Sequence, residues 1–343
     1  MELNERMKNI LTAVVHRYIT TAEPVSSAVI AEKYNLNLST ATIRHEMYLL
    51  EKYDYLWQPH ISSGRIPTDK GYRFYVDNLM VKNYLKEKEK REIIRIYRKN
   101  KEFEETMKIT SQLLSKLTDN IGVVLAPVIH NNIVNNIQFV AVGNNRILTV
   151  IITDAGLVCQ KIINVSGEID KDRLNYLSNF INSKLAEKDI NITNLNNMLL
   201  DELDKIISFQ EKYSHIHNFL EECFDFEYSE NKVYLDGRMN IIKHPEFKET
   251  DKFNYILSLI EEENILADTI RGYLGFRKTK IIIGKESKLK EMQNCSLVTS
   301  EYSIKGKPAG AIGILGPTRM DYPRMVSIAE YISDKLSEIL SEF

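Results

Sequence analysis

The chemistry that this sequence offers most clearly is hydrogen-bond donation from one short stretch. At about 100° per helical residue, His45 and Tyr48 point away from the apolar stripe of their segment, with Arg44 on its flank. Such side chains can meet base edges and phosphates in the major groove of DNA. We therefore predict a DNA-reading helix in which Arg44 reads a guanine or clamps a phosphate. The alternative is that Arg44 pairs with Glu46 or Glu51 on the same helix. The candidate DNA-binding residues are Ser39, Thr40, Thr42, Arg44, His45, Tyr48, His60, Ser63 and Arg65.

Arg65 follows a Ser-Ser-Gly turn, with His60 and Ser63 close to it in the sequence. A turn of small residues can approach a DNA backbone closely, and an arginine beside it can contact phosphates or the minor groove with little base selectivity. We expect this contact from Arg65, and the alternative is a purely structural arginine. Lys70 and Arg73, in the next helix, could also reach phosphates.

The elements that must position these side chains are well marked. Ser39 is a good N-cap, and Ile43, Met47 and Leu50 recur at helical period behind it. A capped helix precedes them, strand formers follow at 55–57, and a turn leads to a second short strand that ends at Pro67. This order predicts a winged helix-turn-helix within residues 1–80. The alternative is a small domain of three helices and a hairpin with no role in DNA binding.

Other clusters offer less. His215, His217 and Cys223 could hold a metal, but i and i+2 do not share a helix face, so we expect no metal site there. GKPAGAIG at 306–313 lacks the spacing of a nucleotide-binding loop and predicts a hairpin. GPTRMDYPR at 316–324 predicts a salt-bridged turn, with an anion site at a helix start as the alternative. No pattern of catalytic residues is visible, so we expect neither an enzyme nor a cofactor.

The rest of the chain divides by composition. Residues 81–101 hold nine Lys or Arg and three Glu, which predicts a solvated basic linker helix that could add to DNA affinity. β-Branched runs between Asn and Gly turns predict strands from 121 to 165, and the series resumes from 280 to 317. The interval between them is acidic, with seventeen Asp or Glu and seven Lys or Arg in 198–270. An acidic segment is repelled by phosphates, which separates it from DNA.

The length of 343 residues favours two or three domains, and the net charge of −2 does not by itself favour nucleic acid. Three isolated cysteines suggest neither a disulfide framework nor a cysteine zinc site, which fits a reducing cytoplasm. The charged N-terminus does not fit a signal peptide, and the apolar runs are too short to span a membrane. We expect a cytoplasmic protein.

Three blocks, STATIRHEM, QPHISSGRIPTDKGYRFYVD and GPTRMDYPRM, resemble the signatures of the HrcA family, the repressors of chaperone operons in bacteria. The resemblance runs through nearly the whole chain and is weakest between about 191 and 279. Two positions depart from the family pattern: His45 stands where Asn is expected, and Asp54 where Gly is expected. Asp tolerates a left-handed C-cap better than most residues, so the fold is preserved.

The resemblance implies an α+β multi-domain fold: a winged-helix DNA-binding domain at 1–80, a basic linker helix at 81–104, a GAF-like domain in two segments at 105–190 and 278–343, and an inserted acidic dimerisation domain at 191–277. It also implies a homodimeric repressor of heat-shock chaperone operons that binds an inverted-repeat operator in double-stranded DNA and is modulated by the chaperonin GroEL. The alternative is a ligand-sensing winged-helix regulator with a small-molecule pocket in the GAF-like domain.

Overall fold

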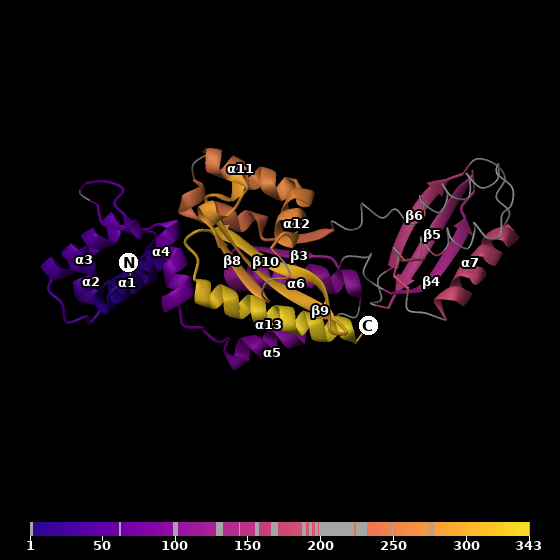
Figure 1. Cartoon of the computed structure of the whole chain (residues 1–343), viewed down its shortest axis with the longest axis horizontal. Coiled ribbons are helices and arrows are strands. Elements are labelled where there is room, and N and C mark those ends of the chain that lie inside the picture. Colours follow the sequence, from indigo (N-terminus) through magenta and orange to yellow (C-terminus); the bar gives the residue numbers. More distant parts are fainter. Residues whose placement is uncertain are drawn as a thin grey trace.

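The computed structural model places three bodies along one long axis (Figure 1). A helical N-terminal body lies at one end, a central body holds a five-stranded sheet, and a separate three-stranded sheet lies at the other end. The mixed α+β class predicted from the sequence is confirmed. The residues described are 3–61, 63–98, 102–127, 133–143, 145–154, 158–165, 171–186, 190–191, 194–195, 198, 223, 232–248, 250–273, 275 and 278–342.

The N-terminal body follows the element order predicted for it. It consists of α1 (Glu5–Thr21), α2 (Ser27–Lys33), α3 (Thr40–Lys52), β1 (Leu56–Trp57), β2 (Ile66–Pro67), α4 (Asp69–Phe74) and a π-helical turn, η1 (Tyr75–Leu79). The hydroxyls of Ser26, Ser39 and Thr68 cap α2, α3 and α4 by accepting a backbone N–H three residues on. The predicted stripe of α3 packs into the core against α1 and is fully buried.

The five-stranded sheet is antiparallel, in the order β7-β3-β10-β9-β8. Its strands are β3 (Ile121–Leu125), β7 (Val233–Asp236), β8 (Thr279–Ile283), β9 (Cys295–Ile304) and β10 (Lys307–Pro317). Helices α6 (Phe103–Thr118) and α13 (Tyr322–Ser341) cover one face, and α11 (Thr250–Glu261) and α12 (Glu263–Arg271) cover the other (Figure 1). Because both faces are covered, β3 and most of β10 are buried at every position.

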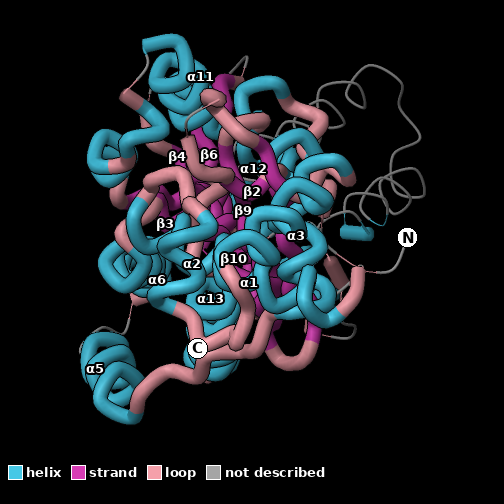
Figure 2. Tube along the Cα trace, turned by 90° about the vertical axis from the view of Figure 1, so that its left-hand side faces the viewer, coloured by secondary structure: helices cyan, strands magenta, loops and turns pink. Residues whose placement is uncertain are grey.

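Short 3₁₀ turns join these elements: η3 (Arg238–Lys243), η4 (Pro245–Phe247), η5 (Gly284–Glu286) and η6 (Lys290–Met292). The basic linker helix is shorter than predicted. Among the described residues of 81–102, the helical part is α5 (Glu87–Tyr97). Ile93 and Tyr97 bury it against the central body, where Tyr97 Oη bonds Thr110 Oγ1 at 2.8 Å. α5 lies on the outer side of this body (Figure 2). Residues 81–86 have no regular secondary structure.

The second sheet is smaller and stands alone, in the order β4-β5-β6. It comprises β4 (Val134–Ala141), β5 (Arg146–Thr153) and β6 (Val158–Asn164), with α7 (Lys171–Leu185) beside β4. The Asn182 amide bonds both the backbone N–H and the C=O of Ile137, so α7 covers part of the free edge of β4.

The strand assignment corrects the domain boundaries expected from the sequence. The strands of 134–164 were expected in the larger sheet, and 232–277 in the insert, yet β7, α11 and α12 belong to the central body. The main chain leaves that body after β3 and returns on its neighbour β7, where Ala126 N–H bonds Lys232 C=O at 2.9 Å. The inserted stretch is therefore 127–231. The strand-forming segments of both sheets have similar residues, and the residues of a strand do not show which strand it pairs with.

The segments FNYILSLI (253–260) and KVYLDGRM (232–239) lie within the stretch expected as a dimerisation domain, and they are α11 and the β7 region. Ile256, Leu259 and Ile260 are at most 2% exposed within the core of their own body. The pair His215 and His217 lies outside the described residues. Within the described part of the chain, no helix combines the length and apolarity needed to cross a bilayer.

Candidate nucleic-acid interface

Helix α3 presents the predicted residues on its outer surface. Ser39, Thr40, Arg44 and His45 are exposed, and Tyr48 is 54% exposed. Ser39 and Thr42 are also engaged at the helix start: Thr42 N–H donates to Ser39 Oγ at 3.1 Å, and the two hydroxyls lie 2.9 Å apart. Their first role is thus to cap the helix that carries the other side chains.

The alternative pairing of Arg44 with a neighbouring glutamate is not formed. Glu46 is 8% exposed and turned inward, and Glu51 accepts from Arg65 Nε at 2.9 Å. Among the described residues, Arg44 makes no hydrogen bond or ion pair, so its five donors are available to a ligand. After the helix, Asp54 has φ of 63°, the left-handed conformation that its position requires.

The turn after β1 is held by its own polar groups. Gln58 Nε2 donates to the carbonyls of Ile61 and Ser63 at 3.0 and 2.8 Å, and His60 N–H donates to Ser63 Oγ at 3.0 Å. His60 is exposed at the tip beside Ile61, which is fully exposed. Reasoning from the sequence missed Ile61 and the half-exposed Trp57, because isolated apolar residues in a hairpin carry no signal of their exposure.

Arg65 is less available than predicted. Its backbone forms a two-way bridge with Val25, at 2.9 and 2.8 Å. Its side chain is 13% exposed and pairs with Glu51 of α3. Arg65 therefore ties the hairpin to α3 in this conformation. Gly64 allows the close approach, because a Cβ there would lie 2.4 Å from the backbone of Val25.

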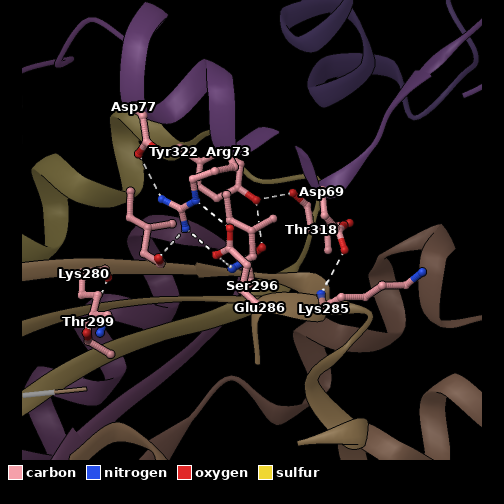
Figure 3. Close-up of polar contacts among 12 residues, drawn as sticks. Asp69, Arg73, Asp77, Lys280, Lys285, Glu286, Ser296, Thr299, Thr318 and Tyr322 are labelled. Atoms are coloured by element: carbon pink, nitrogen blue, oxygen red, sulfur yellow. Dashed lines mark hydrogen bonds and ion pairs between the residues drawn. The ribbon is translucent and has the colours of Figure 1, made fainter. Parts of the chain in front are cut away.

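Two further cations named from the sequence bind other groups of the protein. Lys70 Nζ donates to the Tyr53 carbonyl at 2.8 Å and lies 4.6 Å from the centre of the Tyr55 ring. Arg73 turns toward the central body and binds Glu286 (Figure 3). The candidate surface for nucleic acid is therefore narrow, formed by α3 and the hairpin tip.

The turn before α13 is salt-bridged, as predicted. Asp321 caps α13 by accepting from Arg324 N–H at 3.3 Å, and Arg324 Nη2 donates to Glu89 at 2.9 Å. Arg319 binds Glu246 and the carbonyl of Ile19.

A cavity of about 710 Å³ lies where the end of the larger sheet meets the second sheet. Leu125, Ile304 and Ala309 give it an apolar floor, and Arg271 and Lys307 line it. Burial lowers the pKa of Arg271, and the smaller effects of the charges of Asp268 and Tyr302 raise it. In the described part of the chain, no three His, Cys, Asp or Glu side chains are grouped to hold a metal.

The comparisons with known proteins settle the family. The family model described as the HrcA protein C-terminal domain matches residues 104–326. The chain belongs to the HrcA family. The resemblance seen in its three sequence blocks is thereby confirmed.

Relatives of similar length match this HrcA family chain from end to end. The heat-inducible transcription repressor HrcA of Desulforudis audaxviator is 37% identical over 347 residues, covering 100% of this chain and 99% of the relative. That of Brevibacillus brevis is 36% identical over 341 residues, covering 99% and 98%. A crystal structure of a hypothetical protein at 2.2 Å resolution covers 99% of both chains with a TM-score of 0.61 and 22% identity, a likeness of fold alone.

Proposed function

We propose that this protein is a homodimeric transcription repressor of heat-shock chaperone operons. Its N-terminal body acts as a winged helix-turn-helix that binds an inverted-repeat operator in double-stranded DNA. The observation that carries the proposal is the outer face of α3, where Arg44, His45 and Tyr48 are exposed and Arg44 has no partner among the described residues. Membership of the HrcA family, whose named relatives are heat-inducible repressors, supports the same function.

The experiment is operator binding by Arg44→Ala. An arginine that reads a guanine contributes about 1–3 kcal/mol, so affinity should fall by about 5- to 150-fold with relaxed selectivity at one position. Lys33→Ala is the matched control, because Lys33 is an exposed cation of the same body outside α3. Equal operator affinity of the folded Arg44 variant and the wild type would refute the assignment.

The wing would add a contact of low base selectivity through His60, Ser63 and Arg65. Since Arg65 pairs with Glu51, DNA must compete with that carboxylate for the guanidinium. The slope of log affinity against log salt should fall by about one unit in Arg65→Ala if Arg65 reaches a phosphate. An unchanged slope would leave Arg65 with only its structural role.

A second copy of the chain would pair through the open face of the three-stranded sheet. One row across that face is Val140, Leu148 and Ile162, and another contains Ile152 and Val158. The row between them is Gln138, Val150 and Gln160, so the face combines apolar side chains with two amides. Val140, Ile152, Val158 and Ile162 are between 38% and 63% exposed. An apolar patch of this kind marks an interaction surface, and two-fold pairing would supply the symmetry that an inverted repeat requires.

GroEL would modulate the active fraction of the repressor. The pairing of β3 with β7 can form only after the chain on either side of the inserted stretch is brought together. Such long-range pairing slows folding, and apolar strands stay exposed until it is complete. A chain that folds in this way exposes the apolar segments that a chaperonin binds. The test is the fraction of refolded protein that binds operator with and without GroEL and ATP, and an equal fraction would refute this part of the proposal.

A ligand-sensing regulator is the second candidate, favoured by the 710 Å³ cavity with its apolar floor and Arg271. Its size suits a small organic molecule. Arg271, Lys305 and Lys307 outnumber Asp154 and Glu301 in its lining, which favours a carboxylate ligand. A carboxylate that binds the native state should raise the melting temperature by mass action. A panel of aliphatic and aromatic carboxylates that leaves the melting temperatures of wild type and Arg271→Gln equally unchanged would reject this candidate.

A further inference from the structure

The turn GPTRM, between β10 and α13, reaches across to the N-terminal body. Arg319 Nη1 donates to the carbonyl of Ile19, in the last turn of α1, at 2.5 Å. Its Nε and Nη2 bind the carboxylate of Glu246. The last carbonyls of a helix have no partner within the helix, and a cation there is favoured by the helix dipole. With the Arg319 side chain only 13% exposed, this is a desolvated bridge rather than a surface ion pair.

A second arginine makes the reciprocal contact from the N-terminal body. Arg73 of α4 donates to both carboxylate oxygens of Glu286 at 2.6 and 2.5 Å and to the carbonyl of Ile281 at 2.7 Å (Figure 3). The hydrogen bond from Arg73 to Glu286 is the main cause that raises the pKa of Arg73. Because a bidentate pair fixes two planes relative to each other, this contact defines an orientation as well as a distance.

The neighbouring contact depends on a glycine. Asp69 Oδ2 accepts the backbone N–H of Lys285 at 3.0 Å (Figure 3), and burial raises the pKa of Asp69. Gly284 has φ of 50°, and a Cβ there would lie 2.4 Å from the Asp69 carboxylate. The loop after β8 is therefore shaped to receive the first turn of α4.

Between the two arginine bridges lies an apolar centre. The rings of Tyr72, from α4, and Tyr322, from α13, are 5.7 Å apart and at most 1% exposed. Tyr322 Oη also bonds Ser296 Oγ at 2.8 Å (Figure 3). A buried aromatic pair flanked by hydrogen-bonded arginines is typical of an interface hot spot. We call the contacts of Arg319, Arg73, Asp69 and Tyr72 with the central body the junction.

The covalent connection alone could not hold this arrangement. Residues 81–86 have no regular secondary structure, and six extended residues span about 20 Å. A tether of that reach lets the N-terminal body shift by more than half a turn of DNA, which is about 17 Å. Without the junction, each α3 could therefore meet half-sites at many separations. With the junction, α3 keeps one position relative to the central body.

We propose that Arg319 and Arg73 are positioning residues that set the operator spacing which the dimer accepts. They touch no DNA, and they act by fixing the N-terminal body on the central body. This inference rests on the proposed function and adds its spacing selectivity. It assigns the GPTRM block a role in specificity although the block lies far along the chain from α3.

The experiment measures binding to duplexes carrying two inverted copies of the half-site that the wild type selects from random DNA. The spacers increase one base pair at a time over a full helical turn. Wild type should prefer its best spacer over one changed by half a turn by about 100-fold, and Arg319→Gln/Arg73→Gln should reduce this preference to about 5-fold. Binding to a single half-site should not change, because the α3 surface is intact.

Two further variants are compared with the arginine variant, one as a control for the loss of a charge and one as a test of the same contacts from the opposite side. Lys82→Gln removes an exposed ion pair with Glu330 and should keep the wild-type spacer profile. Glu246→Gln/Glu286→Gln weakens the same bridges from the central body and should reproduce the broad profile. Spin labels at positions 33 and 338, diluted with unlabelled protein, should give a narrow distance distribution in wild type and a broad one in the arginine variant.

The outcomes separate the two claims. A wild type that selects no inverted repeat would refute the proposed function. A wild type that selects one, with spacer profile and label distances unchanged in both double variants, would overturn the role of the junction alone.

Discussion

The two sheets of this protein are built from similar residues but are buried differently. β3 and β10 of the five-stranded sheet read as nearly unbroken apolar runs, IGVVL and AGAIGILG, and helices cover both of their faces. β4 and β6 of the three-stranded sheet interrupt their apolar residues with Asn, Gln and Lys, and one face stays exposed. The first sheet buries its apolar surface within its own fold, whereas the second leaves apolar surface exposed that another molecule can cover.

This difference was readable in principle. Continuous apolar strands predict a sheet covered on both faces, while alternating strands predict a sheet with one open face. Because both series of strands were recognised by their β-branched content alone, strands that do not pair were assigned to one sheet. The lesson is that the period of a strand carries information about its sheet that composition does not.

The largest expected effect compares a buried leucine with an exposed isoleucine. Leu297→Ala, in β9, removes a side chain with no exposed surface and should lower the free energy of unfolding by about 2–5 kcal/mol. Ile162→Ala, in β6, changes a side chain that is 56% exposed and should cost less than about 1 kcal/mol in the monomer. Urea titrations at several protein concentrations would separate folding from dimerisation. Equal losses would mean that both faces of the smaller sheet are covered.

A smaller effect compares two buried hydroxyls. Tyr302 Oη donates to the Leu125 carbonyl at 2.7 Å inside the larger sheet, so Tyr302→Phe leaves that carbonyl unpaired and should cost about 1–3 kcal/mol. Thr149, in β5, is equally buried, but among the described residues the partner of its hydroxyl is the Cys223 sulfur, at 3.4 Å. Because sulfur is a weak acceptor, Thr149→Val should cost less than about 1 kcal/mol. Thermal unfolding of the two variants compares them, and the opposite order would contradict the assignment.

The smallest effect concerns two thiols. Burial raises the pKa of Cys295 to about 12 and that of Cys159 to about 11. At pH 8 both are protonated, and the thiolate fraction of Cys159 is about tenfold the larger. Iodoacetamide followed by peptide mass spectrometry should therefore label Cys159 faster than Cys295, with both slower than an exposed thiol. Faster labelling of Cys295 would show that the larger sheet opens more readily than the smaller.

Local signals predicted the N-terminal body well. Ser39 before an apolar stripe located α3, and the positions of Arg44, His45 and Tyr48 followed from helical geometry. The ion pair of Arg65 with Glu51 joins residues 14 positions apart. The contact of Arg73 with Glu286 joins residues 213 positions apart. No spacing rule covers such pairs, because they depend on how finished elements dock. The pairing of β3 with β7 has the same origin, and so does the displacement of the insert from 191–277 to 127–231.

We propose that the smaller sheet pairs two copies of the chain, while the body with the larger sheet holds the DNA-reading N-terminal body. The most direct test is Ile152→Lys/Ile162→Lys, which places two charges on the open face. The control is Tyr176→Lys, because Tyr176 of α7 is 74% exposed. Sedimentation and operator binding are measured on the same samples. We predict a folded monomer, with dimer affinity reduced by at least about 100-fold and only half-site DNA binding, while the control stays dimeric. A variant that remains a dimer and keeps full operator affinity would contradict the claim.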